Sequence, residues 1–152
     1  MATGKTNSKH IRVFVDDTGG TVRHVSAAVT NVTGVGLTHQ ETDVTGYSDG
    51  IINFTLGHPS SEIEITGPLD NTAAAASPTH SGPHIVFSAL NGNQAATSTL
   101  TIQIGIRAAP VSGDPEFEGE YYCSSYVVNG DGTYTARMVP ASGTAPAWGT
   151  VS

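Results

Sequence analysis

The sequence contains one cysteine, one tryptophan and no long apolar run. A single cysteine cannot pair within the chain, which excludes an internal disulfide framework. No stretch approaches the roughly 18 consecutive apolar residues that a membrane-spanning helix requires, and the opening residues MATGKTNSKH lack the apolar stretch of a secretory signal. We therefore expect a soluble protein made in the cytoplasm, in which the Asn-X-Thr sequons at Asn31 and Asn53 are without function.

Basic residues are scarce, and half of them lie at the start of the chain. Six Lys and Arg stand against thirteen Asp and Glu, charged residues are 12% of the 152, and the formal charge is -7. Lys5, Lys9 and Arg12 precede the first turn signal. A nucleic-acid-binding domain would instead gather its basic residues in a patch. We expect an acidic body that repels polyanions, and a basic N-terminal arm that is either disordered or docked on an acidic neighbouring copy.

Short alternating runs of Thr, Val, Ile, Tyr and Gly are abundant, which predicts an all-β domain with many turns. The length suits a single domain. Apolar alternation predicts strands and one closing hairpin over these ranges: 10–16, 21–32 with a break at 26–28, 51–56, 61–69, 84–90, 97–106 and 116–138. The glycine-bearing turn at residues 17–20 (DTGG) predicts a further hairpin between the first two of these strands. A short helix is predicted over residues 70–76, N-capped by Asp70 or Asn71 and stopped before Pro78.

Two stretches fit neither strand nor core. Residues 34–57 (GVGLTHQETDVTGYSDGIINFTLG) are polar, acidic and Gly-bearing, and only their last part looks strand-like. A weakly patterned connection of this length is usually a binding loop. Residues 140–152 are rich in Pro, Gly and Ala with one aromatic residue. The predicted organisation is an N-terminal arm (1–9), a β-domain (10–139) that carries the long loop, and a C-terminal tail (140–152).

The stretch EGEYYCSSYVVNGDGT, residues 118–133, resembles the end of an immunoglobulin variable domain. That fold needs a second cysteine on the opposite sheet and a tryptophan packed over the bridge. Here Cys123 has no partner, and Trp148 lies far downstream. The stretch therefore predicts only a β-hairpin with an Asn-Gly-Asp-Gly turn. Within it, Cys123 is expected to be a small buried hydrophobic residue rather than a reactive thiol.

The residues do not assemble into a recognisable catalytic or metal site. Of six histidines only His80 and His84 are close in sequence, whereas a zinc site needs three or four ligands on a rigid scaffold. There is no Gly-x-Ser-x-Gly elbow, no phosphate-binding loop and no suggestive Cys/His spacing. We expect a protein that is not an enzyme and that uses no cofactor or metal.

Carboxylates recur at a spacing of two, which places them on one face of a strand. They form two groups: Glu62 and Glu64, and Glu116, Glu118 and Glu120. Glycosidases also use paired carboxylates, but adjacent acids on a strand are most often its solvent-facing side. The spacing alone therefore predicts two acidic strand faces and leaves their role open.

The order of the sequence motifs resembles the tail tube (major tail) proteins of long-tailed bacteriophages. The likeness spans about residues 10–143 and rests on short phrases that run in the order of the family. These phrases are DDTGGT followed by VRHVSAAVTNV, the acidic ETDVTGYSD, FTLG, EIEITGPLD, and the closing PEFEGEYYCSSYVVNGDGTYTARMVPASG. Residues 81–110 are hard to match to the family, and residues 34–39 are longer and richer in glycine than its pattern.

The resemblance implies an antiparallel β-sandwich or half-barrel with one short flanking helix. It also implies a homo-oligomer, hexameric rings stacked into a hollow tail tube that conducts DNA during ejection without binding it specifically. The subunit would then belong to the virion tail, be assembled in the cytoplasm of the host bacterium, and contact other phage tail proteins but no membrane. Ring closure would also pair exposed sheet edges with those of neighbouring copies.

Within this picture three sets of residues are candidates for function. Glu62, Glu64, Glu116, Glu118 and Glu120 are candidates for the lumen, where carboxylates would repel passing DNA. Glu41, Asp43, Tyr47 and Asp49 are candidates for contacts between rings, and Lys5, Lys9, Arg12 and Trp148 for contacts made by the two arms. The alternatives are a head decoration or head–tail completion protein of a phage virion, and a small β-fold enzyme or binding domain unrelated to phages.

Overall fold

The computed structural model describes residues 8–95, 97–141 and 144–152, and the regular secondary structure of this part of the chain is mainly antiparallel β-strand. The strands are β1 Ile11–Asp16, β2 Val22–His24, β3 Asn31–Thr33, β4 Thr38–Asp43, β5 Phe54–Ser60, β6 Ile63–Pro68, β7 Ser98–Ile104, β8 Pro115–Val128, β9 Thr133–Pro140 and β10 Ala147–Thr150. The helical elements are the 3-10 turns η1 Ser8–His10 and η2 Ser26–Ala28 and the α-helix α1 Pro83–Leu90.

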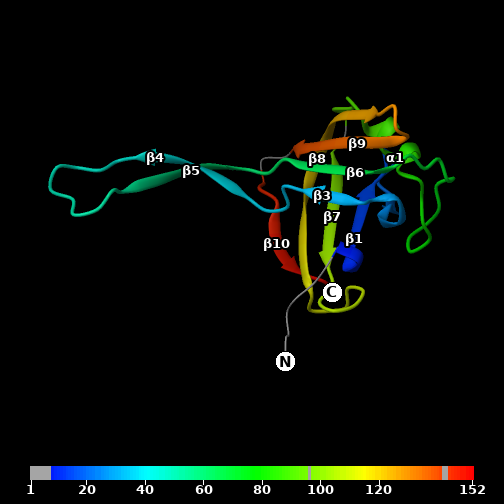
Figure 1. The fold of residues 1–152 in the computed structure, drawn as a ribbon, viewed down its shortest axis with the longest axis horizontal. Helices are drawn as coiled ribbons and strands as arrows, with labels where there is room; N and C mark the ends of the chain where they lie inside the picture. The colour runs from blue at the N-terminus through cyan, green and yellow to red at the C-terminus, as the bar shows by residue number, and fades with distance from the viewer. Residues whose placement is uncertain (1–7, 96, 142–143) are drawn as a thin grey trace.

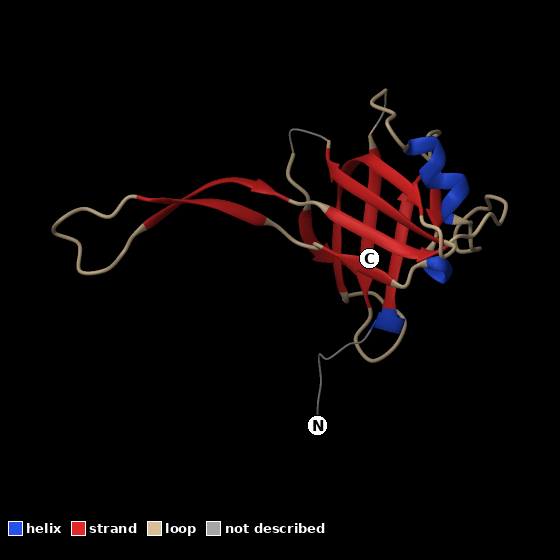
Figure 2. Cartoon of the chain, turned by 45° about the horizontal axis from the view of Figure 1, so that its top comes forward, coloured by secondary structure: helices blue, strands red, loops and turns tan. Residues whose placement is uncertain are grey.

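The long strand β8 joins the two halves of the main sheet, whose strand order is β2-β1-β7-β8-β9-β6-β3. Its first half, residues 116–121, pairs with β7, and its second half, residues 121–128, pairs with β9. The strands of the two halves cross over one another in Figure 2. The predicted all-β fold with two packed antiparallel layers and one short helix is confirmed.

The core lies between the two halves of the sheet. It is built from alternate residues of five strands together with one face of α1. Its fully buried members include Val13, Val15, Ile63, Ile65, Phe87, Leu100, Ile102, Phe117, Tyr121, Tyr134 and Met138. Two buried phenols are satisfied, as buried polar groups must be: Tyr121 Oη lies 2.9 Å from Ser61 Oγ, and Tyr134 Oη donates to the carbonyl of Ala28 at 3.0 Å.

Both hairpins predicted from turn chemistry are confirmed. Residues 17–20 connect β1 to β2, and residues 129–132 connect β8 to β9. The break predicted at residues 26–28 is the 3-10 turn η2, where Ser26 Oγ accepts a hydrogen bond from the backbone N–H of Val13 at 2.7 Å. Cys123 is buried as expected, and burial raises the pKa of its thiol to about 11, so it is not a reactive nucleophile.

The strand predicted over residues 84–90 is wrong, because this segment is the helix α1. Pro83 occupies the first turn, where its missing N–H costs nothing. Val86, Phe87 and Leu90 then recur at helical spacing and are buried against the sheet. A short apolar run does not by itself distinguish a buried strand from a buried helix.

The helix predicted over residues 70–76 is also wrong, since these residues have no regular secondary structure. A run of alanines has high helix propensity, but a segment this short needs an apolar face to bury. Instead the side chain of Asp70 accepts hydrogen bonds from Thr72, and Ser81 Oγ bonds both the N–H and the carbonyl of Ala75. These side-chain bonds hold the segment as an irregular loop.

Two segments expected to be irregular contain strands. The 34–57 loop is for the most part a hairpin, in which β4 and β5 form a separate two-stranded sheet that projects from the body (Figure 1). Residues 147–150 of the expected tail form β10, which pairs with residues 115–118 of β8. The ring of Trp148 packs on Phe117 with ring centroids 5.0 Å apart, so this aromatic residue is attached to the body of its own chain.

A close backbone approach fixes the base of the hairpin. Gly34, between β3 and β4, has φ of 83°, and a Cβ atom there would lie 2.0 Å from the carbonyl oxygen of Glu62, just before β6. Only glycine tolerates both this conformation and this approach. The two ends of the projecting segment are thereby held together where it leaves the body.

We expect Gly34→Ala to lower the free energy of unfolding by about 2 kcal/mol or more, because positive φ alone costs a side-chain-bearing residue roughly 1–2 kcal/mol and the clash with Glu62 adds to it. Urea unfolding of the unassembled chain measures the effect. Gly130→Ala is the matched control, because a Cβ at this turn glycine meets nothing within 4 Å. Equal stability of the two variants would show that the base of the hairpin is not constrained in this way.

Candidate assembly surfaces

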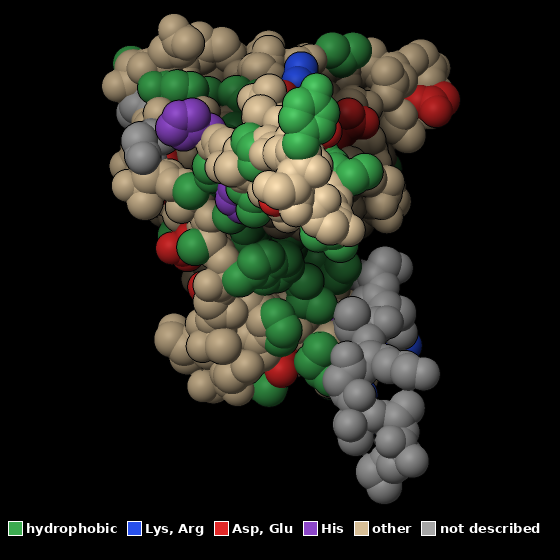
Figure 3. All heavy atoms as spheres, turned by 90° about the vertical axis from the view of Figure 1, so that its left-hand side faces the viewer, with side chains coloured by type: hydrophobic (Ala, Val, Ile, Leu, Met, Phe, Trp, Pro, Cys, Tyr) green, Lys and Arg blue, Asp and Glu red, His purple; other side chains and the backbone are tan. Residues whose placement is uncertain are grey.

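The β4–β5 hairpin is the most exposed element of the structure. Every residue of both strands is exposed, and the hairpin extends away from the side of the body opposite α1 (Figures 1 and 2). Figure 3 looks at the molecule from the side on which the hairpin projects, where hydrophobic side chains lie on the surface. A two-stranded hairpin with no core of its own is at best marginally stable in water. The hairpin is therefore expected to complete its packing against another molecule.

Apolar and acidic side chains share one face of the hairpin. In the antiparallel register Asp43 lies opposite Phe54 and Glu41 lies opposite Leu56, and residues directly opposite one another point to the same side. The intervening pair, Thr42 and Thr55, points to the other side. The hairpin thus presents a face on which each apolar side chain has a carboxylate beside it.

Two aspartates fix the shape of the loop at the tip. Asp43 Oδ1 accepts hydrogen bonds from the N–H and hydroxyl of Thr45 at 2.9 and 2.6 Å. Asp49 Oδ2 accepts from the N–H of Gly46 at 2.7 Å and from Asn53 Nδ2 at 2.9 Å. These hydrogen bonds lower the pKa of both carboxyl groups. Asp43 and Asp49 therefore shape the loop, whereas Tyr47 at its end is fully exposed.

Sequence reasoning identified the acidic residues of this segment and Tyr47, and missed its other apolar residues. Ile51, Ile52 and Leu56 are 74%, 63% and 68% exposed, and Phe54 and Val44 are about half exposed. A contiguous group of exposed apolar side chains marks an interaction site. The signal was present in the sequence as IINFTL, an apolar run inside a segment that otherwise had no core pattern.

A second surface is the outer face of the β7–β8 pair, where three glutamates form a ladder. Each faces a polar, uncharged residue of β7: Glu116 faces Gln103, Glu118 faces Thr101 and Glu120 faces Thr99. Gln103 Nε2 donates to Glu116 at 2.9 Å, Thr101 donates to Glu118 at 3.1 Å, and both Thr97 and Thr99 donate to Glu120. The structure therefore brings together the three carboxylates that the sequence placed on one strand face.

A fourth carboxylate, which sequence reasoning missed, lies beside this ladder. Burial raises the pKa of Asp16 at the end of β1, the negative charges of Glu120, Asp17 and Glu118 raise it further, and a hydrogen bond from Thr99 opposes the rise. Mutual repulsion of this kind identifies a surface of one sign. The sequence places Asp16 at the end of a strand, but only the pairing of β1 with β7 in the structure brings it to this face. We call Asp16, Glu116, Glu118 and Glu120 the acidic face.

The other predicted pair of glutamates lies in the other half of the sheet, next to a basic residue. Glu62 and Glu64 are exposed at β6, in the other half of the sheet. Arg137 on β9 forms an ion pair with Glu62 at 2.5 Å and lies directly opposite Glu64 in the register. The structure thus separates the two predicted groups of glutamates, and a cation offsets the charge of this one.

The four residues predicted to make arm contacts also have different settings. Lys5 lies outside the described residues. Lys9 is exposed in η1, and Arg12 in β1 donates from Nη1 to the carbonyls of Lys9 and Ile11 at 2.9 and 3.1 Å. Trp148 is about half exposed on β10, near the base of the hairpin, where its ring lies 3.9 Å from a Cβ position at Gly36.

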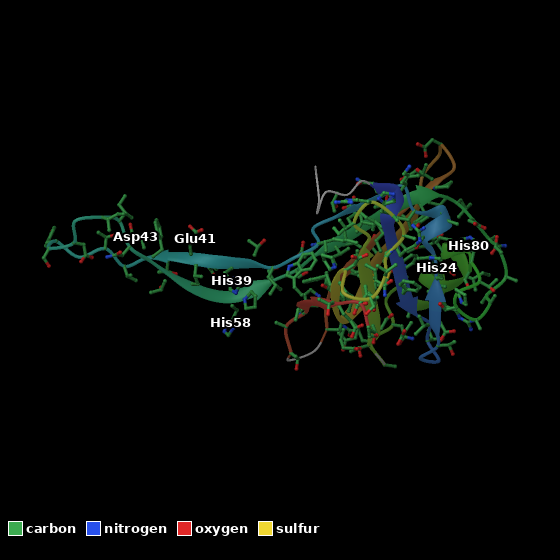
Figure 4. All side chains as sticks on the ribbon, turned by 90° about the horizontal axis from the view of Figure 1, so that it is seen from below. His24, His39, Glu41, Asp43, His58 and His80 are labelled. Atoms are coloured by element: carbon green, nitrogen blue, oxygen red, sulfur yellow. The ribbon has the colours of Figure 1, made fainter. Side chains whose placement is uncertain are left out.

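The histidines do not converge on a metal site. Figure 4 shows His24 and His80 side by side in the body, and His39 and His58 far away on the hairpin. Among residues 8–95, 97–141 and 144–152 no group of three or more His, Cys, Asp or Glu side chains is placed to hold a metal ion. His80 Nε2 instead pairs with Asp70 Oδ2 at 2.7 Å, which ties residue 70 to the segment before α1.

Comparisons with known proteins identify the fold. No family model matches the chain, and no curated protein matches it by sequence. One similar solved structure is a chain of the sheath–tube complex of an extracellular contractile injection system (PVC) in the extended state, with a TM-score of 0.60, 12% identity, and 97% of this chain and 93% of that chain covered. A second is the cap that terminates the tube of the anti-feeding prophage, with a TM-score of 0.62, 10% identity, and 99% and 95% covered.

The chain has the fold of these tube-complex and tube-cap proteins. The likeness covers almost the whole length of both partners, so the hairpin falls within the compared length. No helix among the described residues is long and apolar enough to cross a membrane.

Because of the Asp70–His80 pair, we expect part of the free energy of unfolding to depend on pH. Hydrogen bonds from Thr72 and then His80 lower the pKa of Asp70 to about 2, from 3.8. A lowered pKa stabilises the fold above the unfolded value, and this contribution is lost as the pH falls toward 2. We expect Asp70→Asn to lower the urea midpoint near neutral pH and the gap to the wild type to close in acid. A gap independent of pH would contradict this assignment.

Proposed function

We propose that this chain is a structural subunit that assembles with identical copies into rings and stacked tubes, as a tail tube protein of a phage or of a phage-like injection particle. The observation that carries the proposal is the exposed β4–β5 hairpin, which forms a sheet separate from the main sheet and whose strand residues are all exposed. The fold shared with tube-complex and tube-cap proteins supports it. The work of the protein is then construction rather than catalysis.

The energetics favour a hairpin that is buried in an assembly. Burial of a large apolar side chain contributes roughly 1.5–3 kcal/mol, and the hairpin and its tip expose six such side chains. They are Val44, Tyr47, Ile51, Ile52, Phe54 and Leu56. Only part of this energy appears as affinity, because association also costs translational and side-chain freedom. Repetition around a ring multiplies what remains, so weak single contacts suffice for a stable tube.

Ring formation would use the margins of the main sheet. β10 pairs with β8 on one side, and among the described strands it has no neighbour on the other. Its outer edge therefore offers backbone N–H and C=O groups to a further strand. An edge on one copy that meets a different surface on the next is a heterologous contact, and such contacts form a ring when the rotation between copies closes. We propose hexameric rings, as the resemblance to tail tube proteins implies.

The acidic face would line the lumen of the tube. Its carboxylates are hydrogen-bonded by threonine and glutamine, which satisfy the oxygens without cancelling the charge. Such a surface repels phosphates, and DNA would pass without binding along the way. Glu62 and Glu64 are poorer candidates than the residues of β8, because Arg137 offsets their charge. The protein would accordingly belong to the virion tail, be assembled in the host cytoplasm and contact other tail proteins.

The hairpin tip provides the first test of assembly. We expect the purified chain to form rings or tubes that are visible by negative-stain electron microscopy. The double variant Ile51→Ser with Ile52→Ser should form only single rings or monomers. Its circular dichroism should be unchanged, because both side chains are exposed in the single subunit. Val111→Ser is the matched control, since Val111 is 63% exposed, as Ile52 is, but lies outside the hairpin. A wild-type chain that remains monomeric at every concentration would contradict the proposed assembly.

A cysteine on the acidic face tests the lumen. Cys123 is buried, so Thr101→Cys introduces one accessible thiol in the middle of the glutamate ladder. In assembled tubes a small maleimide should label this thiol, whereas a maleimide on a long polyethylene glycol chain should be excluded. Unassembled subunits of the same variant are the control and should react with both reagents. Equal labelling of tubes by the two reagents would place this face on the outside.

A further inference from the structure

A groove separates β1 from β3 on the body of the protein. The outer edge of β1 pairs with β2 only over residues 14–16, and β3 pairs with β6 on one side and with no described strand on the other. A cavity of about 160 Å³ opens between the two strands, enough room for a large side chain but not for a whole strand pair. Two strand edges therefore flank a gap that the described part of the chain leaves unfilled.

The groove combines an apolar lining with a basic rim. Ile11, Val29 and Val32 line it and are only partly buried against the core. Lys9 and Arg12 also line it. The hydrogen bonds from Arg12 to the carbonyls of Lys9 and Ile11 hold the guanidinium at this end of β1. Since the chain has only six basic residues, two of them at one small apolar groove are a notable concentration.

We infer that this groove receives the mixed face of the β4–β5 hairpin from a second copy of the chain. The inference rests on the proposed self-assembly and names the surface that accepts the hairpin. The apolar side chain of Leu56, or of its neighbour Phe54, enters the cavity, and the carboxylate of Glu41 meets Arg12 and Lys9 at the rim. On the hairpin Glu41 lies directly opposite Leu56, so one cross-strand pair supplies both the apolar and the acidic group.

Charge complementarity favours this occupant. The hairpin and its tip carry Glu41, Asp43 and Asp49 and no Lys or Arg. Asp43 and Asp49 are engaged within the tip, whereas among the described residues Glu41 has no hydrogen bond or ion pair. Opposite charges brought together in a contact that excludes water fix its register and disfavour wrong pairings. The hairpin and the groove are also different surfaces of one chain, so their contact propagates from copy to copy.

A charge swap tests the inference on the full-length chain. We expect Arg12→Glu and Glu41→Arg each to raise the protein concentration needed for half-maximal sedimentation of assemblies by tenfold or more, and the double variant to recover most of the loss. Arg137→Glu is the control, because this arginine forms an exposed ion pair in the other half of the sheet. If Arg12→Glu assembles at the same concentration as the wild type, the inference that the groove receives the hairpin is overturned, whereas the proposed tube assembly is not. A wild-type chain without assemblies would overturn the proposed function and this inference together.

Cross-linking identifies the occupant directly. The natural cysteine is buried, so Phe54→Cys with Asn31→Cys, beside the groove, should be joined between copies by a short bis-maleimide in assemblies. Phe54→Cys with Ala89→Cys, an exposed residue of α1, should not be joined. Gly4→Cys with Asn31→Cys tests whether the chain's own N-terminal segment fills the groove. The inference would be overturned by an intramolecular product from that pair together with the absence of a cross-link between copies from Phe54→Cys with Asn31→Cys.

Discussion

The constraint on which the rest of the structure depends is that a two-stranded hairpin cannot bury its own side chains. β4 and β5 pair their backbone groups only along the edge that they share, and every residue of both strands is exposed. A monomeric protein that exposes such a hairpin bears both the cost of its apolar surface and the risk of unspecific pairing. The arrangement makes physical sense when the missing packing layer comes from another copy of the chain.

The body supplies what such a hairpin needs, a rigid base. The shared strand β8 ties the two halves of the sheet together, and the phenols of Tyr121 and Tyr134 bind Ser61 and the carbonyl of Ala28 inside the core. Burial raises the pKa of both tyrosines, so they remain neutral hydrogen-bond partners. Because Gly34 holds the chain against Glu62, the hairpin leaves the body at a fixed point. Its position is thus set by the core rather than by a flexible linker.

The sequence predicted the features that follow from local alternation and turn chemistry, and it missed those decided by packing at a distance. The all-β class, both tight hairpins and the common face of Glu116, Glu118 and Glu120 depend on periodicity and glycine placement. Alternation did not reveal that residues 84–90 form a helix, since the burial of Val86, Phe87 and Leu90 against the sheet selects it. Nor did composition reveal β10, because its pairing with β8 is a contact between residues far apart in the chain.

Packing at a distance also explains why the two groups of glutamates, which have the same spacing in the sequence, lie on surfaces of different charge. On β6 the cross-strand neighbour of Glu64 is an arginine, which also pairs with Glu62, so the charge of the two glutamates is offset in part. On β8 every cross-strand neighbour is neutral, so the carboxylates keep their hydrogen bonds and also their charge. Burial raises the pKa of Asp16, and the nearby charges of Glu120 and Glu118 raise it further, in keeping with a negative field within one subunit. In a closed ring the low dielectric of the wall would concentrate that field in the bore. A uniform negative bore needs carboxylates whose partners are uncharged, and of the two glutamate groups only the one on β8 meets that condition.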